Sequence, residues 1–292
     1  MTSQPSILAD VPRHASFLFL DVRAGVDAVV ATRQLGAVPH PSHLLVGLGS
    51  TLLASLGAQI PGIRPMTIPI GAGARMPHTP SDVVLRVTGD DPGEVLHRER
   101  EVLARLGGYT TSDRVEAFLF GDSRDLTGYE DGTENPAPVD APGVALKHGV
   151  GPGLDGSSVV AIQRWVHDLD AFAAMSPTEQ DHTFGRARQS NEELDDAPAS
   201  AHVQRTAQED FAPEAFVWRR SMPWRDHRGE GLVFVSFSAT LDPFEALARR
   251  MVGHDDGIVD ALFSFTRPVT GGAWWCPPLR GDRLDLRACL PS

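Results

Sequence analysis

The sequence predicts an α+β protein made of two similar ferredoxin-like lobes, each with an antiparallel sheet. The motif Asp-Pro-x-Glu begins a helix-like segment at Asp91 and again at Asp242, each time just after a β-rich run. The two motifs lie about half a chain apart, as expected of a duplicated unit. Between them, residues 136–158 are crowded with Pro and Gly, which predicts a crossover loop with no element of its own.

The first half reads as strand, helix, strand, helix. Residues 16–22 form a short apolar run with few turn formers, which predicts a buried strand. A helix is expected from about residue 26 to 35, and a second β-rich run follows at 82–88. A charged segment with helical apolar spacing occupies 95–106.

The starts of two helices carry recognisable capping residues. Asp91 is expected as the N-cap, Pro92 in the first turn and Glu94 as the third residue, which together predict a capping box. The same pattern at Asp242 predicts a helix that runs through Met251.

The second half repeats the order of the first. Residues 159–166 occupy the place that 16–22 hold in the first half, and 232–238 form the next expected strand. We therefore expect domains at 1–145 and 146–292. A doubly wound parallel sheet is the competing architecture, but no Gly-x-Gly-x-x-Gly follows a strand.

Composition excludes some functions. The 292 residues carry a formal charge of −12, whereas a nucleic-acid-binding protein needs a basic surface. No run approaches the roughly 18 apolar residues of a membrane span, and the first residues do not resemble a secretory signal. Cys276 and Cys289 are too few for a disulfide framework. We therefore expect a cytoplasmic protein without nucleic-acid or membrane partners.

The stretch 120–136 holds more acids and turn formers than a simple connection needs. Gly128 and Gly132 allow close approach of a flat ligand, and Asp131 between them could enter a pocket. Asp-Gly and Thr-Gly are also ordinary turn formers, so a structural loop remains an alternative. The alternating acids of a calcium loop are not present.

Two further segments carry candidate site residues. His202 follows the acidic stretch 191–198, and an imidazole held by an acceptor on its second nitrogen can ligate a haem iron. In a strand, Arg219 and Ser221 share one face, which brings a cation and a hydroxyl together. That face could be an exposed surface with a salt bridge, or it could stabilise an oxyanion beside a carboxylate.

Taken in order, these motifs resemble the dye-decolorising peroxidases, a family of haem enzymes. The likeness covers almost the whole chain and is closest to the compact B-type branch. It rests on Asp122-Ser123-Arg124-Asp125, Asp131-Gly132-Thr133-Glu134-Asn135-Pro136, Gln163-Arg164-Trp165-Val166-His167, Gly185-Arg186, His202, Arg219-Arg220-Ser221-Met222-Pro223 and Gly271.

The resemblance implies one haem b per chain, bound in the C-terminal lobe with His202 as the axial iron ligand. It implies that Asp131 moves a proton between the peroxide oxygens while Arg219 stabilises the developing negative charge. Hydrogen peroxide would be reduced to water through an oxoferryl intermediate. Dyes, phenolics or similar small molecules would then give up one electron at a time.

Other residues take roles from the same resemblance. Glu134 would assist proton traffic, Arg186 would contact a haem propionate, and Asp260 would accept a hydrogen bond from His202. Ser221 stands where many B-type relatives have Asn, so a distal amide becomes a smaller hydroxyl. Glu130 replaces a commonly apolar residue and could face either the pocket or solvent.

The alternatives are a haem-binding or haem-delivery protein with little peroxide turnover, and a structural protein without a cofactor. Family members often form oligomers, so we expect a homo-oligomer. The last residues show no obvious tail, so packaging in an encapsulin shell is not expected. Candidate relay sites for bulky donors are Trp165, Trp218, Trp224, Trp274, Trp275, Tyr109 and Tyr129.

Overall fold

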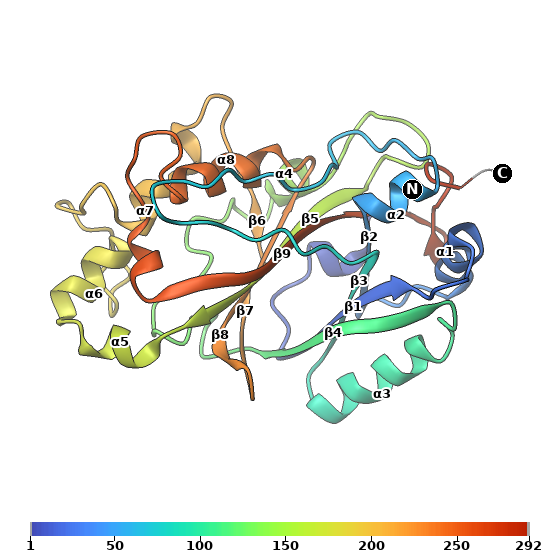
Figure 1. Ribbon diagram of the computed structural model, residues 1–292, viewed down its shortest axis with the longest axis horizontal. Coiled ribbons are helices and arrows are strands. Elements are labelled where there is room, and N and C mark those ends of the chain that lie inside the picture. Colours follow the sequence, from blue (N-terminus) through green and yellow to red (C-terminus); the bar gives the residue numbers. More distant parts are fainter. Residues whose placement is uncertain (1, 291–292) are drawn as a thin grey trace.

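The N-terminal lobe of the computed structural model is a four-stranded antiparallel sheet covered by helices on one face (Figure 1). The structure describes residues 2–290. The strand order is β4-β1-β3-β2, the order of a ferredoxin-like unit. The elements are η1 (Pro5–Ile7), β1 (His14–Val22), α1 (Ala28–Ala37), β2 (Leu44–Gly49), α2 (Ser50–Ser55), β3 (Val83–Gly89), α3 (Pro92–Leu103) and β4 (Tyr109–Phe118).

The C-terminal lobe repeats this arrangement with the order β9-β5-β8-β7, and β6 pairs with β8 beside β7. Every strand pair is antiparallel, which confirms the predicted fold class and excludes the doubly wound sheet. The elements are α4 (Ala141–Ala145), β5 (Ser158–His167), α5 (Leu169–Ala174), α6 (Pro177–Phe184), α7 (His202–Arg205), η2 (Gln208–Asp210), β6 (Trp218–Arg219), β7 (Met222–Asp226), β8 (Gly229–Ser238), α8 (Asp242–Met251), η3 (Ala261–Ser264), β9 (Thr266–Cys276), β10 (Leu279–Arg280) and β11 (Arg283–Leu284).

The two sheets join at both edges and close into a ring. β2 pairs with β9 through Leu48 and Trp275, and β4 pairs with β7 through Ala117 and Trp224. Because strand side chains alternate, each strand sends one set of residues into the ring and the other towards the helices of its own lobe. The inner set forms a shared core that includes Phe17, Val84, Val160, Val235 and Trp274.

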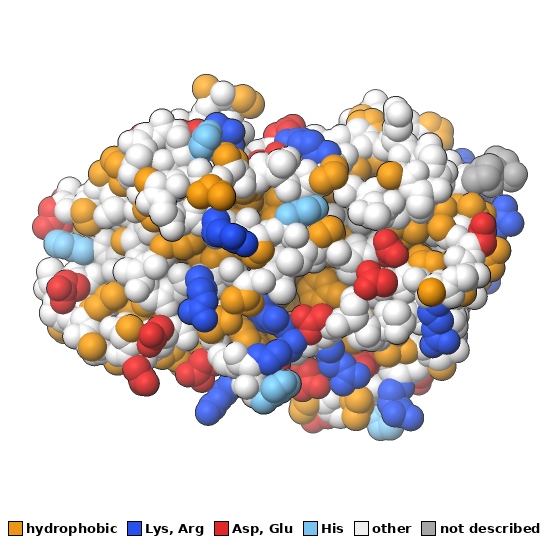
Figure 2. Space-filling view, viewed as in Figure 1, with side chains coloured by type: hydrophobic (Ala, Val, Ile, Leu, Met, Phe, Trp, Pro, Cys, Tyr) orange, Lys and Arg blue, Asp and Glu red, His pale blue; other side chains and the backbone are white. Residues whose placement is uncertain are grey.

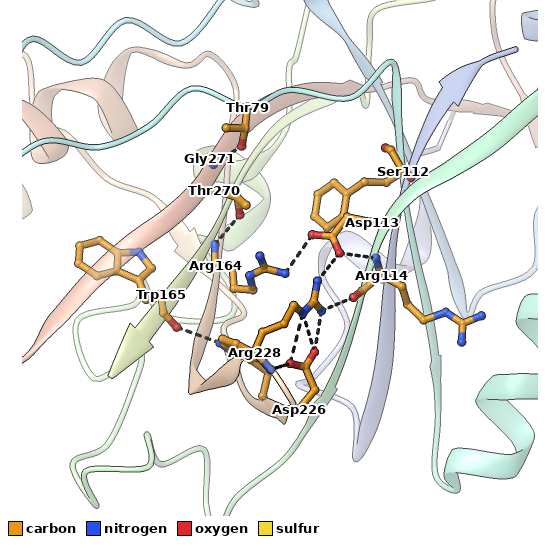
Figure 3. A network of polar contacts seen from close by, with 12 residues as sticks. Thr79, Ser112, Asp113, Arg114, Arg164, Trp165, Asp226, Arg228, Thr270 and Gly271 are labelled. Carbon is orange, nitrogen blue, oxygen red and sulfur yellow. Dashed lines mark hydrogen bonds and ion pairs between the residues drawn. The ribbon is translucent and has the colours of Figure 1, made fainter. Parts of the chain in front are cut away.

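A polar network crosses the seam between β4 and β7 (Figure 3). Asp113 on β4 accepts hydrogen bonds from Arg164 on β5, at 2.9 Å, and from Arg228 at the β7–β8 turn. Arg228 also binds Asp226 at the end of β7. In Figure 2, basic and acidic side chains gather side by side over this part of the surface. The pairing between β4 and β7 is short, so this polar network helps to fix β5 relative to the N-terminal lobe.

The helix starts differ from the prediction in detail. Asp91 caps α3 by accepting from the backbone of Gly93 and Glu94, but the Glu94 carboxylate accepts from Asp90 and does not complete a capping box. Asp242 lies inside α8, and its carboxylate bonds Thr240 and Arg64. The prediction that Asp242 caps α8 was therefore wrong, because its carboxylate bonds Thr240 and Arg64 instead of the backbone at the helix start.

The crossover segment also differs from the prediction. Residues 136–158 contain a short helix, α4, where none was expected. Pro142 lies in its first turn, a position where the missing N–H costs no helix bond. The domain boundary between residues 145 and 146 stays a prediction. Within residues 2–290, no helix is both long and apolar enough to cross a bilayer.

Candidate active site

A cavity lies between the helix-facing side of the C-terminal sheet and α7, α8 and the loop 120–136. It contains about 1040 Å³ of space free of atoms, its open mouth included. Much of the wall is apolar: Met76, Tyr129, Trp165, Phe184, Val217, Leu232, Phe234, Phe244, Leu247, Ala248, Met251, Leu262 and Phe265. A large flat apolar group with a few polar contacts would suit such a wall.

His202, the first residue of α7, lines this cavity. Its Nδ1 atom lies 2.7 Å from Oδ2 of Asp260, a carboxylate that is almost completely buried. The second oxygen of Asp260 accepts from the backbone N–H of Leu262, at 2.9 Å. In a neutral imidazole, donation from Nδ1 to this carboxylate leaves the lone pair on Nε2. This arrangement is typical of a histidine that ligates a metal.

Asp131 and Arg219 line the same cavity and contact each other. Arg219 Nη2 lies 3.1 Å from Asp131 Oδ1, and both side chains are mostly buried. The side-chain amide of Asn135 forms two hydrogen bonds with the backbone of Arg219. Its oxygen accepts from the Arg219 N–H at 2.7 Å, and its nitrogen donates to the Arg219 carbonyl at 3.1 Å. The loop 120–136 thus presents the carboxylate and also fixes the strand that carries the cation.

The conformation of this loop depends on glycine at two positions. Gly128 and Gly132 have φ values of +90° and +83°, in the left-handed region that other residues avoid. The backbone N–H of Asp131 donates to the Ser123 carbonyl at 2.9 Å, which closes the turn. The two glycines therefore allow the turn that places Asp131 at the cavity.

Glu130 is one of the residues that line the cavity, and its side chain is 33% exposed. Both carboxylate oxygens are occupied: one accepts from Arg124 at 2.7 Å and the other from Asn191 at 2.9 Å. Its charge is therefore partly compensated by Arg124.

Glu134 also lines the cavity, and its carboxylate is paired with Arg186. Arg186 additionally donates to the Asn191 carbonyl, at 2.9 Å, and is not itself among the residues of the cavity wall. The Arg186 guanidinium is therefore already shared between a carboxylate and a backbone carbonyl. Its role stays a prediction.

Ser221 is not at the cavity. Its hydroxyl accepts from the backbone N–H of Val235, at 3.3 Å, and the residue is buried. The expected shared face ends because β6 covers only Trp218–Arg219, and the chain is irregular before β7 begins at Met222. The prediction that strand alternation brings the hydroxyl beside Arg219 was wrong.

The sequence did not reveal a second polar pair at the cavity, His167 and Asp125. His167 Nε2 lies 2.9 Å from Asp125 Oδ2, and its Nδ1 lies 2.6 Å from the Thr266 hydroxyl. Burial would raise the pKa of Asp125, but the hydrogen bonds from His167 and Thr127 outweigh it and hold that pKa below its usual value. Both residues lie in quoted motifs, yet no sequence signal pairs positions so far apart.

Known proteins share the sequence features of this chain. Residues 122–281 match the family model described as "Dyp-type peroxidase, C-terminal". The dye-decolorizing peroxidase of Mycobacterium tuberculosis is 30% identical, over 100% of this chain and 92% of that protein. This chain belongs to the dye-decolorizing peroxidase family. Its members are oxidoreductases that act on peroxide.

Solved structures of the family have the same fold. A variant of DypB from Rhodococcus jostii RHA1 in complex with heme is 25% identical, with a TM-score of 0.83, over 93% of this chain and 95% of that one. A dye-decolorizing protein from V. cholerae is 28% identical, with a TM-score of 0.80, over 94% and 97% of the two chains. The duplicated lobes of this dye-decolorizing peroxidase are thus shared by both.

Proposed function

We propose that this family member is a haem peroxidase of the B-type branch that binds one haem b in the C-terminal lobe. One observation carries the proposal: a histidine with a buried carboxylate partner and an Asp–Arg pair line a single apolar cavity. A haem carrier would need the histidine, but would not need the Asp–Arg pair.

The residues present fit a haem better than a bare metal ion. Within residues 2–290, no group of three or more His, Cys, Asp or Glu side chains is arranged to hold a metal ion by itself. A haem iron needs only one protein ligand, and His202 offers Nε2 for that bond. The apolar wall suits the porphyrin faces. A relative in complex with heme supports the same conclusion.

When bound, haem b would supply the iron chemistry, including the oxoferryl state that stores the oxidising power of peroxide. The side chains contribute proton movement and charge. Asp131 accepts the proton from the inner oxygen of hydrogen peroxide and delivers it to the outer oxygen, which leaves as water. Arg219 stabilises the negative charge that develops as the O–O bond breaks. Arg219 Nη2 lies 3.1 Å from Asp131 Oδ1, so both groups can act on the same peroxide molecule.

We propose dyes, phenolics or similar small one-electron donors as reducing substrates, as the family name suggests. Glu134, which lines the cavity, would assist proton traffic, and Arg186 beside it would contact a haem propionate. Ser221 would act only indirectly, because its hydroxyl bonds the backbone of Val235 and so helps to position strand β8. We also propose a homo-oligomer, and a cytoplasmic location in keeping with two cysteines that are both buried and free.

The test uses the purified protein loaded with haem. A Soret band that requires His202 would establish the cofactor and its ligand. Stoichiometric peroxide, followed by stopped-flow absorption, should then convert the spectrum within milliseconds to seconds. Asp131→Ala should slow this step by roughly 10²-fold or more. Asp122→Ala, at an exposed position of the same loop, is the matched control and should behave as wild type.

Two results would overturn the proposal. A Soret band without any peroxide reaction would identify a haem-binding or haem-delivery protein. A protein that takes up no haem would exclude both haem functions and leave a structural protein.

A further inference from the structure

His167 and Asp125 form a buried pair at the cavity that the proposed peroxide step does not use. Their side chains are 5% and 11% exposed. Of the ion pairs that join the loop 120–136 to the rest of the described chain, this one is the most buried; those at Asp131 and Glu134 are more open. A buried pair is costly to break, because the partner that remains is left as an unpaired charge.

His167 is held on the sheet side of this pair. It is the last residue of β5, a strand that pairs with β8 on one side and with β9 on the other. Its Nδ1 lies 2.6 Å from the hydroxyl of Thr266, its cross-strand partner in β9. That hydroxyl donates to the Val166 carbonyl at 3.0 Å, so it is free to accept from Nδ1. Both ring nitrogens therefore face acceptors, which fixes the orientation of the imidazole in the cavity wall.

Asp125 organises the turn on the loop side of the pair. One carboxylate oxygen faces the imidazole, and the other accepts from the backbone N–H and the hydroxyl of Thr127, at 2.8 and 2.6 Å. The Asp125 backbone accepts from the Gly128 N–H at 2.8 Å and donates to the Tyr129 carbonyl at 2.9 Å. The turn is therefore built around this one residue, and the imidazole holds that residue against β5.

Two contacts fix the loop to the C-terminal sheet, one on each side of Asp131. Before it, Asp125 bonds His167 on β5 at 2.9 Å. After it, Asn135 bonds the backbone of Arg219 on β6. A loop held at one end can pivot about that end, whereas a loop held at both ends keeps the residue between them in place. The position of Asp131 at the cavity therefore depends on both contacts.

We propose that His167 is a positioning residue for the peroxide step: it holds Asp125, and so the turn that keeps Asp131 beside Arg219. The inference rests on the proposed function, which assigns the proton transfer to Asp131. A proton carrier must lie within hydrogen-bond reach of the atoms that it serves, so a displacement of about 1 Å slows the step. His167 acts through Asp131 and does not contact peroxide.

The experiment measures the peroxide step by stopped-flow absorption in the haem-loaded protein. His167→Phe keeps a planar ring but removes both donors, and it should slow the step by roughly 10- to 10²-fold. His167→Gln keeps an N–H close to the place of Nε2 and should recover much of that loss. His182→Gln is the matched control and should behave as wild type, because the His182 side chain is 38% exposed and lies 3.9 Å from Asp196, away from the loop.

A second set of variants separates positioning from general damage to the fold. In the Asp131→Ala protein, His167→Phe should slow the reaction by less than about twofold further, because the proton carrier that it positions is absent. His167→Phe combined with Asp125→Ala should cost no more than the larger of the two single losses, because both break one contact. The Soret band and the far-ultraviolet circular dichroism of each variant report haem loading and folding independently of the rate.

The outcomes separate the inference from the function on which it rests. If wild type reacts with peroxide and His167→Phe reacts equally fast, the inference fails and the peroxidase stands. It fails in the same way if His167→Phe slows wild type and Asp131→Ala by the same factor, or if His167→Gln is as slow as His167→Phe. Should His167→Phe not bind haem, Asp125→Ala with and without Asp131→Ala makes the same comparison. If wild type shows no spectral reaction with peroxide at all, both proposals fail together.

Discussion

The two lobes have the same strand order, yet the large apolar cavity lies in the C-terminal one. In the N-terminal lobe, the helix-facing residues are aliphatic and fill the space under α1 and α3, with Leu18, Leu20 and Leu85 almost completely buried. In the C-terminal lobe, β5 presents Gln163, Trp165 and His167 to the same side.

The connections after the first strand of each lobe explain the rest of the difference. Residues 23–43 lead from β1 to β2 with one helix, α1, which packs directly on the sheet. Residues 168–217 lead from β5 to β6 with α5, α6 and α7, and they bring His202 to the cavity. The longer connection and the polar and aromatic residues on one strand face therefore distinguish the lobe that carries the cavity.

The largest expected effect is on stability in the filled lobe. Leu20→Ala removes a fully buried side chain from a close-packed core, so the free energy of unfolding should fall by roughly 2–5 kcal/mol. Leu232→Ala, on the cavity wall and only partly buried, should cost much less because the new space joins an existing opening. Urea unfolding of both variants checks this. Equal losses would show that the cavity wall is packed like the first core.

The next effect is on the peroxide step. Arg219 is the only Arg or Lys among the cavity-lining residues of the described chain, whereas four carboxylates line it. Arg219→Ala should therefore slow the peroxide reaction by roughly 10²–10³-fold, and more than Asp131→Ala does. Arg219→Lys, which keeps the charge, should recover part of the rate. Stopped-flow rates decide, and a larger loss in Asp131→Ala would contradict the prediction.

The sequence predicted the repeated fold well because its signals are local. Apolar runs and Asp-Pro starts placed β1, β3, β5, β8, α3 and α8 close to where they lie. It failed where a contact across the chain decides the outcome. Asp242 does not cap α8 because Arg64 and Thr240 bind it, and Ser221 turns to Val235 because the strand breaks. No periodicity in the chain reveals those partners.

Part of the site was also predictable, because some of its residues belong to local sequence motifs. Asp131, Arg219 and His202 came from motifs, and the structure brings all three to one cavity. The pairs His167–Asp125 and Tyr129–Asp181 join residues more than forty positions apart, as their hydrogen bonds show. Such pairs form only when strands and helices fold together, so one sequence alone does not show them. The helix α6 was missed although Ser176 and Glu179 form a full capping box.

A smaller effect is expected on the cofactor. Asp260→Asn removes the charge that orients His202, so the affinity for haem should fall by roughly 10–100-fold. Asp256→Asn is the matched control, since Asp256 binds Arg205 on the same helix, at 2.7 Å, but not His202. Haem dissociation rates measured with an excess of a haem-scavenging apoprotein compare the two. Equal losses would mean that α7 as a whole, rather than the carboxylate at Nδ1, sets the affinity.

The smallest effect tests whether the pair formed by His167 on β5 and Asp125 in the loop 120–136 makes the protein sensitive to acid. The pKa of Asp125 is lower in the folded protein, despite its burial, because His167 and Thr127 donate to it. The unfolded chain then binds more protons as pH falls, so the stability from Asp125 is present above its ordinary pKa of 3.8 and is lost below it.

Asp125→Asn should cost about 1 kcal/mol at neutral pH, the net value of a typical hydrogen bond. The difference from wild type should shrink as the pH falls from about 5 towards 3. Urea unfolding across that range measures it, with Asp122→Asn as the control in the same loop. If the difference in unfolding free energy between Asp125→Asn and wild type stays constant with pH, the charge of Asp125 does not contribute to stability. The contact between Asp125 and His167 would then not be sensitive to acid.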